Sequence, residues 1–588
     1  MATSTRGKAG RDEIGDSQER KTRRRAAGER SGATIIRVLE DRLTTESERP
    51  LLATEISGQI QNIEISGAQL TIAQVAAVAR RKRRVQLSDD PEVRQRILAS
   101  RQILDEKLRR GEILYGVNTG LGGNVRYILP ARDLAKHQQN IFRFLICGSG
   151  EPLPEDVVRA AILLRANALA KGYSAVRPVV IERLIDLLNC GITPIVPMYG
   201  SVGASGDLIP SAYIGRVLLG EADVMFKGEK ISADRALALS GLQPLTLEPK
   251  EGLALINGTT VMTGAAALQI DDGAYLSQLA LAACALALEA MKSTDDPFRE
   301  AVQAVKNHPG QIEAAALCRK FIEGSGYVRR LDDLRARVRE SLRGNNDSMA
   351  RSDEAIQQPY SLRCVPQGIG PILEAVKINQ VVIERELNSA NDNPLFDPVE
   401  GCVYHTGNFY GGHVARALDS WKIDLATMGN WLHALIAMVV DERFNNGLPA
   451  NLAPHPGLFS GFKGMQLCLT SLVCALRQLA NPSMIHTLPT EQYNQDMVSL
   501  GMHSALTAMQ MTTLLRDATA IALITLCQAI DLRGGGERLG RGNRAVFDAV
   551  RRQVAFADQD RPMDGDIRTV AELIHGRSIP IPELSEAL

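Results

Sequence analysis

The stretch that decides the fold class is VMTGAAALQIDDGAYLSQLALAACALALEAM, residues 261–291. Alanine and leucine, two of the best helix formers, dominate it, and apolar residues occupy more than one face of the helix that it would form. In a water-soluble protein such a helix must be buried between other helices. The stretch therefore predicts a mainly α protein built on a bundle of long helices.

Other segments of similar composition extend this bundle along the chain. They are predicted over Pro371 to Leu387, Gly412 to Val440, Gly464 to Leu479 and Met497 to Asp531. Upstream, residues 157–191 predict two helices that are broken at Gly172 and end at Gly191, because glycine commonly terminates helices. We expect part of the burial to occur between subunits, since long parallel helices pack well across symmetric interfaces.

The composition excludes several classes of protein. The 588 residues suit about four domains or one large enzyme subunit. Lys and Arg number 67, as do Asp and Glu, which argues against a nucleic-acid or membrane-surface protein because both need a face of one sign. The nine cysteines are scattered without a CxxC pair, so neither a disulfide framework nor a zinc site follows. We expect a soluble, cytoplasmic protein without a metal ion.

The chain divides into four predicted parts. Residues 1–33 are rich in charge, Gly and Ser and predict a disordered arm, whose KTRRR run is expected to be solvated rather than bound to nucleic acid or a membrane. Residues 34–250 form an N-terminal domain with short strands before Leu70, residues 251–540 the long-helix domain, and residues 541–588 a helical tail. The longest uncharged stretches carry polar residues, Pro or Gly, which indicates buried core rather than a bilayer span.

The densest loop chemistry lies in PIVPMYGSVGASGDLIPSAY, residues 194–213. Asp207 stands where it would cap the following helix. One interpretation is a glycine-rich loop that cradles a phosphate, although no nucleotide-binding spacing occurs. The other concerns Ala204, Ser205 and Gly206, because Gly206 has no side chain and lets its nitrogen approach the Ala204 carbonyl closely enough to close a five-membered ring. Loss of water from the ring and from Ser205 would leave a methylidene, a strong electrophile.

This loop resembles the cofactor loop of the aromatic amino acid ammonia-lyases and aminomutases, in which the tripeptide cyclises autocatalytically to 4-methylidene-imidazol-5-one (MIO). Further family motifs follow in order within residues 75–540. They are LYGVNTGLG (114–122), RANALAKGYSAVR (165–177), EGLALINGT (251–259), QQPYSLRCVPQ (357–367), ERELNSANDNPLF (384–396), HTGNFYGG (405–412), NNGLPANL (445–452), GFKG (461–464), LANP (479–482) and EQYNQD (491–496). The amino-acid sequences of these motifs most resemble those of bacterial phenylalanine ammonia-lyases.

The resemblance implies an architecture and a cofactor. The fold would be the all-helical type of the ammonia-lyases and fumarases, a homotetramer with a central helical core and active sites built from three subunits. MIO would form from Ala204, Ser205 and Gly206 in the N-terminal domain, which would also carry a lid loop around residues 110–130. The substrate would be a small aromatic amino acid, and no metal or nucleotide is implied.

The resemblance also assigns roles to individual residues. Tyr115 would remove the β-proton of the substrate, which needs a phenolate and therefore surroundings that lower a pKa of about 10. Arg363 would clamp the substrate carboxylate through two parallel hydrogen bonds, although taken alone it suits a surface ion pair. Tyr360 and Gln357 would lie beside cofactor and substrate, on one face if their segment is helical. Gln358 stands where many members carry an aspartate, which puts an outer hydrogen bond in doubt.

Other matched positions would line the site. Asn257, Asn408 and Gln495 would hydrogen-bond within it, although single asparagines are usually turn or cap residues. Phe409 would pack near the substrate ring, and Lys463 of GFKG would contact the substrate. Three further residues are expected to fix the backbone and subunit contacts rather than to do chemistry: Asn388, Asp392 and Asn393.

Two adjacent residues, which in the family face the aromatic ring of the substrate, give a partial prediction of the substrate. Phe-Leu is typical of phenylalanine users, His-Leu of tyrosine users and Ser-His of histidine users, and this chain has Phe144 and Leu145. Burying a phenol or an imidazole beside an apolar pair costs on the order of 1–3 kcal/mol without a partner. Both residues also suit plain core packing. We expect deamination of L-phenylalanine to trans-cinnamate, with tyrosine second and histidine disfavoured.

Three alternatives stay open from the sequence. An aminomutase uses the same parts but returns the amine to the β-carbon. The superfamily also contains cofactor-free lyases such as fumarases, which lack the Ala-Ser-Gly tripeptide and the tyrosine of YSLR. A non-catalytic helical scaffold would not need Tyr115, the tripeptide and Arg363 all intact.

Overall fold

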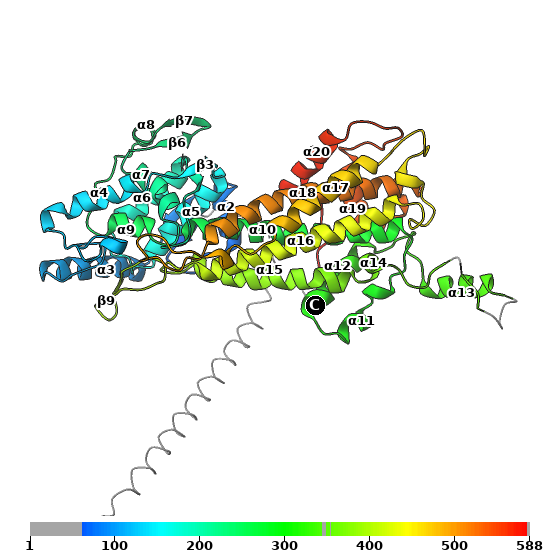
Figure 1. Cartoon of the computed structure of the whole chain (residues 1–588), viewed down its shortest axis with the longest axis horizontal. Helices are drawn as coiled ribbons and strands as arrows, with labels where there is room; N and C mark the ends of the chain where they lie inside the picture. The colour runs from blue at the N-terminus through cyan, green and yellow to red at the C-terminus, as the bar shows by residue number, and fades with distance from the viewer. Residues whose placement is uncertain (1–61, 344–348, 353, 585–588) are drawn as a thin grey trace, which may run out of the picture. The chain divides into compact units, whose positions relative to one another are not determined.

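Five long helices form the bundle that the sequence predicts (Figure 1). The computed structural model describes residues 62–343, 349–352 and 354–584. The bundle helices are α10 (Thr260–Ala290), α15 (Val365–Leu387), α16 (Gly412–Val440), α17 (Lys463–Leu479) and α18 (Gly501–Leu532). Helix α10 packs against α15, α16 and α18, and α17 packs against α16 and α18. Helices α10, α16, α17 and α18 agree with predicted helices to within four residues at each end, whereas α15 begins six residues before the predicted start and contains Pro371 in its interior. The mainly α prediction is confirmed.

Burial explains the unbroken apolar character of these helices. Almost every side chain of α10 is buried, including those on opposite faces, because neighbouring helices surround it. By length and composition α10, α16 and α18 could each cross a membrane, yet most of α10 and α18 is already covered by the protein itself. Their hydropathy is therefore the composition expected of helices at the centre of a bundle.

The first part of the described chain is built from shorter helices and small sheets. Its helices are α2 (Ile72–Ala79), α3 (Pro91–Arg109), α4 (Leu134–Phe144), α5 (Glu155–Ala170), α6 (Pro178–Cys190), α7 (Leu208–Leu218), α8 (Ala233–Leu239) and α9 (Glu251–Ile256). Helix α6 ends as predicted at Gly191, whose φ of 70° is left-handed. Helix α5 contacts α10 and joins this part to the bundle.

The strands are short and pair locally. Strands β1 (Ile63–Ile65) and β2 (Val85–Leu87) are parallel, with Ile63 opposite Val85. Strands β3 (Ser149–Pro152) and β5 (Pro197–Tyr199) are antiparallel, as are β4 (Ile192–Pro194), β6 (Asp223–Phe226) and β7 (Glu229–Ser232) in one sheet. Strands β8 (Leu395–Asp397) and β9 (Cys402–Tyr404) form a hairpin. The predicted strand in IEISG is thus present as β1, whereas the predicted arm and the strands before residue 62 lie outside the described residues.

The remaining helices are shorter than those of the bundle. They are α11 (Glu300–Ala304), α12 (Pro309–Phe321), α13 (Leu331–Ser341), α14 (Tyr360–Arg363), α19 (Arg541–Arg551) and α20 (Asp564–His575). Helix α12 packs on α15, and α20 packs on α18. The described residues between 62 and 583 belong to one compact unit, and the predicted boundary at 250/251 remains a prediction.

The starts of three bundle helices meet beside the tripeptide Ala204–Ser205–Gly206. A Cβ on Gly411 or on Gly501 would come within 2.4 Å of the Met262 sulfur, so α10, α16 and α18 begin side by side. Helix α15 runs the other way, since Glu386 near its C-terminus bonds to Thr259 just before α10. We call this region the tripeptide end, and the region where α14 lies and α15 begins the distal end.

Candidate active site

The tripeptide is held against a second glycine backbone. The Ser205 carbonyl accepts hydrogen bonds from the Gly258 N–H (3.1 Å) and the Asn257 side-chain amide (3.2 Å). The Gly258 carbonyl in turn accepts from the Asp207 N–H at 2.7 Å. Gly206 has a φ of 73°, and a Cβ on it would lie 2.0 Å from the Gly258 oxygen. Only glycine fits at position 206, which agrees with the close backbone approach expected from the sequence.

Asp207 does not cap the helix that follows it, contrary to the sequence expectation. Its carboxylate accepts from the N–H groups of Val261 (3.0 Å) and Met262 (2.7 Å) at the start of α10, and from the Ser201 hydroxyl (2.9 Å). The prediction failed because the carboxylate binds the N–H groups at the start of a different helix, which lies more than 50 residues away in the sequence. Complete burial raises the pKa of Asp207 to about 6, while these hydrogen bonds oppose the rise.

The tripeptide environment fits MIO. The Gly206 nitrogen, which would close the ring, takes part in no hydrogen bond within the described residues. The Ser205 oxygen, which would remain on the ring, already has two N–H donors that would stabilise negative charge there. The Asn257 Oδ1 is buried and unpaired in the described chain, next to the tripeptide. Helices α7, α10 and α18 also begin around the loop and direct the positive ends of their dipoles toward it.

Gln495 lies where the sequence predicted, beside the tripeptide. Its Nε2 is 3.4 Å from the Ser205 Oγ. Ala204 packs with Val498 and Leu500, just before α18. The 490–500 segment therefore closes one side of the tripeptide and links it to the lid loop.

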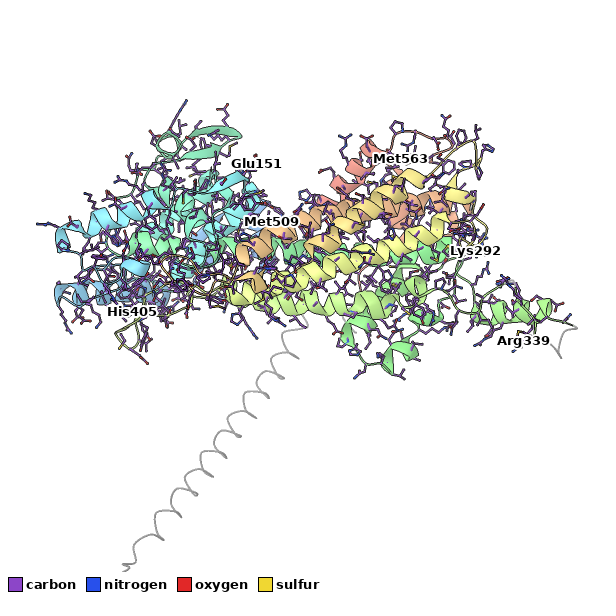
Figure 2. The ribbon with its side chains drawn as sticks, in the orientation of Figure 1. Glu151, Lys292, Arg339, His405, Met509 and Met563 are labelled. Carbon is purple, nitrogen blue, oxygen red and sulfur yellow. The ribbon has the colours of Figure 1, made fainter. Side chains whose placement is uncertain are left out.

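Tyr115 lies in the predicted lid loop and is half-buried. Its N–H donates at 3.3 Å to the Nε2 of His405, a residue labelled in Figure 2, and its hydroxyl accepts from the Gly122 N–H at 3.0 Å. The next residue, Gly123, donates its N–H to both Glu491 carboxylate oxygens at 3.0 Å. Glu491 thereby docks the loop onto the segment that carries Gln495.

The pKa of Tyr115 is raised, not lowered as its predicted role requires. Burial is the main cause, and the negative charge of Glu491 adds to it. The Gly122 hydrogen bond acts in the opposite direction because it stabilises the phenolate. Within one chain the phenol is thus positioned but not activated.

Phe144 and Leu145 end helix α4, which packs against α7 and α9. These two helices flank the tripeptide loop, because α7 begins just after it and α9 ends just before Asn257. Leu145 is buried (6% exposed), whereas Phe144 is 60% exposed. The expectation that both residues are packed therefore holds only for Leu145, and Phe144 presents its ring outward.

Asn408 and Phe409 lie near the start of α16, also at the tripeptide end. The Asn408 side-chain amide donates to the Ala390 carbonyl at 3.1 Å, and the residue is exposed. Phe409 is half-buried. Both lie on the same side as the tripeptide, because a Cβ on the adjacent Gly411 would contact Met262 and Thr259.

Arg363 and Tyr360 lie at the distal end. The Arg363 guanidinium carbon stands 4.5 Å from the centre of the Tyr360 ring, and that ring is 70% exposed. The Arg363 Nε is buried and has no hydrogen-bond partner among the described residues. At a rise of about 1.5 Å per residue, helix α15 carries the chain about 32 Å from Val365 to Glu386 at the tripeptide end. Figure 1 accordingly shows α14 and α9 far apart.

Gln357 is also at the distal end, but it shares no helical face with Tyr360. Helix α14 begins only at Tyr360, and Gln357 precedes it in irregular backbone. The physical reason is Pro359, which disfavours helical backbone at the residue before it. The conditional expectation of one helical face is therefore wrong.

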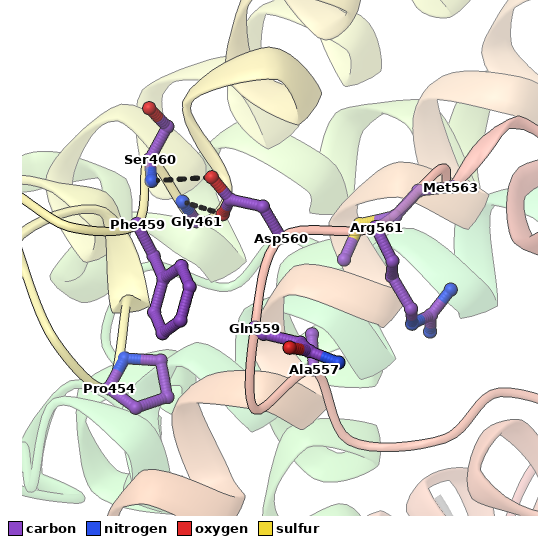
Figure 3. A pocket seen from close by; sticks show the side chains of 9 residues that line it. All are labelled: Pro454, Phe459, Ser460, Gly461, Ala557, Gln559, Asp560, Arg561 and Met563. Atoms are coloured by element: carbon purple, nitrogen blue, oxygen red, sulfur yellow. Dashed lines mark hydrogen bonds between the residues drawn. The ribbon is translucent and has the colours of Figure 1, made fainter.

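Lys463 begins α17, which runs antiparallel to α16, since Thr470 bonds to His433 and Arg477 to Asn430. Lys463 consequently lies near the C-terminal end of α16, at the distal end. The Asp560 carboxylate holds the loop that leads into α17, because it accepts from the N–H groups of Ser460 and Gly461 at 2.8 Å each (Figure 3).

Two residues that lie inside the family motifs, but to which the sequence assigned no role, make contacts at this site. Arg165 of RANALAKGYSAVR and Glu491 of EQYNQD contact the backbone around the tripeptide and the lid loop. Asp392 forms a buried ion pair with Lys250 at 2.6 Å, which agrees with its expected backbone-fixing role. In the described residues, no group of three His, Cys, Asp or Glu side chains could hold a metal ion.

Comparisons with known proteins identify the family of the chain. Residues 70–552 match the family model described as aromatic amino acid lyase. The chain is 36% identical over 520 residues to a histidine ammonia-lyase of Caldanaerobacter subterraneus subsp. tengcongensis, covering 88% of this chain and 98% of that protein. It also resembles the solved structures of a tyrosine aminomutase from Streptomyces globisporus (TM-score 0.85, 34% identity, 88% and 98% covered) and of Pantoea agglomerans phenylalanine aminomutase (TM-score 0.84, 33% identity, 87% and 99% covered).

The chain belongs to the aromatic amino acid lyase family. It is an enzyme of the ammonia-lyase and aminomutase class, and its cofactor is MIO formed from the tripeptide. The scaffold and cofactor-free alternatives are thereby excluded.

Proposed function

We propose that this enzyme converts L-phenylalanine to trans-cinnamate and ammonia without oxidation. The observation that carries the choice of substrate is the apolar pair Phe144 and Leu145 at the end of α4, next to the helices that flank the tripeptide. Neither side chain can hydrogen-bond a phenol or an imidazole, so a substrate with either group would lose about 1–3 kcal/mol of hydrogen bonding on burial there. The unsubstituted phenyl ring of phenylalanine incurs no such cost.

MIO supplies an electrophile that makes the substrate amine a better leaving group. Arg363 is free to form a two-pronged clamp on the substrate carboxylate, since its Nε has no partner in the described chain. Tyr115 takes the β-proton, and the Gly122 N–H stabilises the phenolate that this step needs. Asn257 and Gln495 orient the substrate amine beside the Ser205 position.

We propose further that the working enzyme is a homotetramer in which different copies complete each site. The separation of about 32 Å along α15 supports this, because Arg363 and Tyr115 of one chain cannot contact the same small amino acid. The exposure of Phe144 and Tyr360 also supports it, because residues that a second copy of the chain covers in an oligomer are exposed in a single chain. A positive group from a neighbouring copy would in addition lower the pKa of Tyr115, which one chain leaves raised.

A second candidate is an aminomutase that uses the same residues. Two solved structures of this fold, at TM-scores of 0.85 and 0.84, are aminomutases, which favours this candidate. The difference would lie in how long the lid loop retains the arylacrylate before the amine returns to the β-carbon. Histidine is the third option, because curated relatives such as the Caldanaerobacter protein are histidine ammonia-lyases, but Phe144 and Leu145 oppose it.

The test is a product analysis with L-Phe, L-Tyr and L-His supplied separately, following arylacrylate, ammonia and β-amino acid together. Equal amounts of cinnamate and ammonia from L-Phe are the expected result. Dominant β-phenylalanine would replace the lyase by the aminomutase. Turnover of tyrosine or histidine alone would overturn the argument from Phe144 and Leu145.

A further inference from the structure

Arg165 is a buried cation that binds only backbone and neutral groups near the tripeptide. It lies on α5 and is 2% exposed. Its Nη1 donates to the carbonyls of Ala254 (3.2 Å) and Asn257 (2.8 Å) and, more distantly, to the Asn391 Oδ1 (3.5 Å), and its Nη2 donates to the Thr260 hydroxyl (3.2 Å). Three of these acceptors lie at the end of α9, in the turn after it and at the start of α10.

Two opposite charges therefore fix this turn. Arg165 sits at the C-terminal end of α9, where free carbonyls attract a cation, and Asp207 sits at the N-terminal end of α10, where free N–H groups attract an anion. Lys250 and Asp392, a buried pair at 2.6 Å, complete a cluster with no net charge. Burial lowers the pKa of Arg165 to about 10, and the charges of Asp392 and Asp207 oppose that fall.

The turn that Arg165 holds is the same turn that hydrogen-bonds to the tripeptide. Asn257 and Gly258 within it donate the two hydrogen bonds to the Ser205 carbonyl, and the Gly258 carbonyl holds the Asp207 N–H. Gly258 packs closely against this cation, since a Cβ there would meet the Asn391 Oδ1 at 2.3 Å and the Arg165 Nη2 at 2.9 Å. The position of Arg165 is thus connected to Ser205 and Gly206 through this turn.

We propose that Arg165 is a positioning residue for the formation of MIO. It holds the 254–260 turn so that the Gly206 nitrogen bonds to the Ala204 carbonyl carbon. One water leaves from that carbon, and Ser205 then loses its Oγ with the α-hydrogen as a second water. Arg165 touches none of these reacting atoms and acts through Asn257 and Gly258. The inference concerns cofactor formation and does not depend on which amino acid the enzyme uses.

The experiment compares Arg165→Lys with a matched control, Arg159→Lys. Arg159 is equally buried on the same helix, and it also binds backbone carbonyls, those of Val78, Ala79 and Leu188, but none near the tripeptide. Lysine keeps the charge at either position, but its donors sit on a single nitrogen and cannot span the acceptors that the two guanidinium nitrogens of arginine reach. Intact mass of the folded, soluble protein is measured at intervals after synthesis, because MIO formation removes two waters, about 36 Da.

We expect ring formation in folded Arg165→Lys to slow by about tenfold or more, since a misplacement of about 1 Å can cost up to a hundredfold in rate. Folded Arg159→Lys should lose the two waters as fast as the parent protein. Equal rates in the parent and both variants would overturn the proposal, as would equal slowing in both variants, which would indicate a general packing role. If Arg165→Lys does not fold, Thr260→Val, which removes one acceptor only, takes its place, and an unchanged rate there would overturn the proposal.

Discussion

The tripeptide end and the distal end of the bundle differ in how complete they are within one chain. At the tripeptide end the Ser205 carbonyl accepts hydrogen bonds from Asn257 and Gly258, and the Asp207 N–H donates to the Gly258 carbonyl, all within the same polypeptide. At the distal end Tyr360 is largely exposed and the Arg363 Nε lacks a partner in the described chain. The difference supports the proposals that one folded chain makes the cofactor and that groups from different copies bind the substrate.

The largest effect should follow from removing the source of the electrophile. Ser205→Ala cannot lose the second water, so the mass deficit of the parent should be absent and activity should fall by about a thousandfold or more. The fold should persist, because the hydrogen bonds from Asn257 and Gly258 use the Ser205 carbonyl, and the hydroxyl accepts only the 3.4 Å hydrogen bond from Gln495. Circular dichroism, intact mass and turnover check this, and full activity in the variant would refute the cofactor assignment.

A mixing experiment tests whether the two ends meet between copies. Ser205→Ala and Arg363→Ala should each be nearly inactive alone, since one lacks the electrophile and the other the carboxylate clamp. When both chains are co-expressed, activity should return to about a quarter of the parent value, the fraction of sites that draw an intact tripeptide and an intact Arg363 from different copies at random. Absence of any recovery in a mixed oligomer would mean that each chain completes its own site.

A smaller effect is expected from Phe144, the residue proposed to face the substrate ring. Phe144→His supplies a partner for a phenol hydroxyl and should raise kcat/KM for tyrosine relative to phenylalanine by about tenfold or more, since such a hydrogen bond is worth about 1–3 kcal/mol when buried. Phe144→Leu is the matched control, because it changes the shape without adding a hydrogen-bonding group. The same selectivity in both variants would show that position 144 does not choose the substrate.

The smallest effect concerns the lid loop and pH. Glu491 raises the pKa of Tyr115 by charge repulsion, so Glu491→Gln should lower that pKa. The phenolate then forms at lower pH, and the alkaline rise of kcat/KM should move to lower pH. Glu112→Gln removes a nearby carboxylate that pairs with Lys107 at 3.0 Å and should leave the profile in place. A profile unmoved in both variants would argue against Tyr115 as the base.

Helix composition and family motifs in the sequence were enough to predict the bundle and the tripeptide chemistry. The apolar, Ala-rich and Leu-rich segments predicted α10, α16 and α18 closely, because such a composition is stable in water only when neighbours surround it. The need for glycine at position 206 was also predictable, since ring closure requires close backbone approach. These features depend on local composition and on covalent chemistry, and both follow directly from the amino-acid sequence.

The tertiary structure alone decided the partners of the polar groups. Asp207 binds the start of α10 rather than that of α7, and Arg165 holds the turn that hydrogen-bonds to the tripeptide. Both contacts join residues that are more than 50 positions apart in the sequence. Burial raised the pKa of Tyr115 where the sequence argument required a fall. Hydrogen bonds and desolvation depend on which groups meet in space, so no local pattern could give them, whereas the helices and the electrophile follow from the sequence itself.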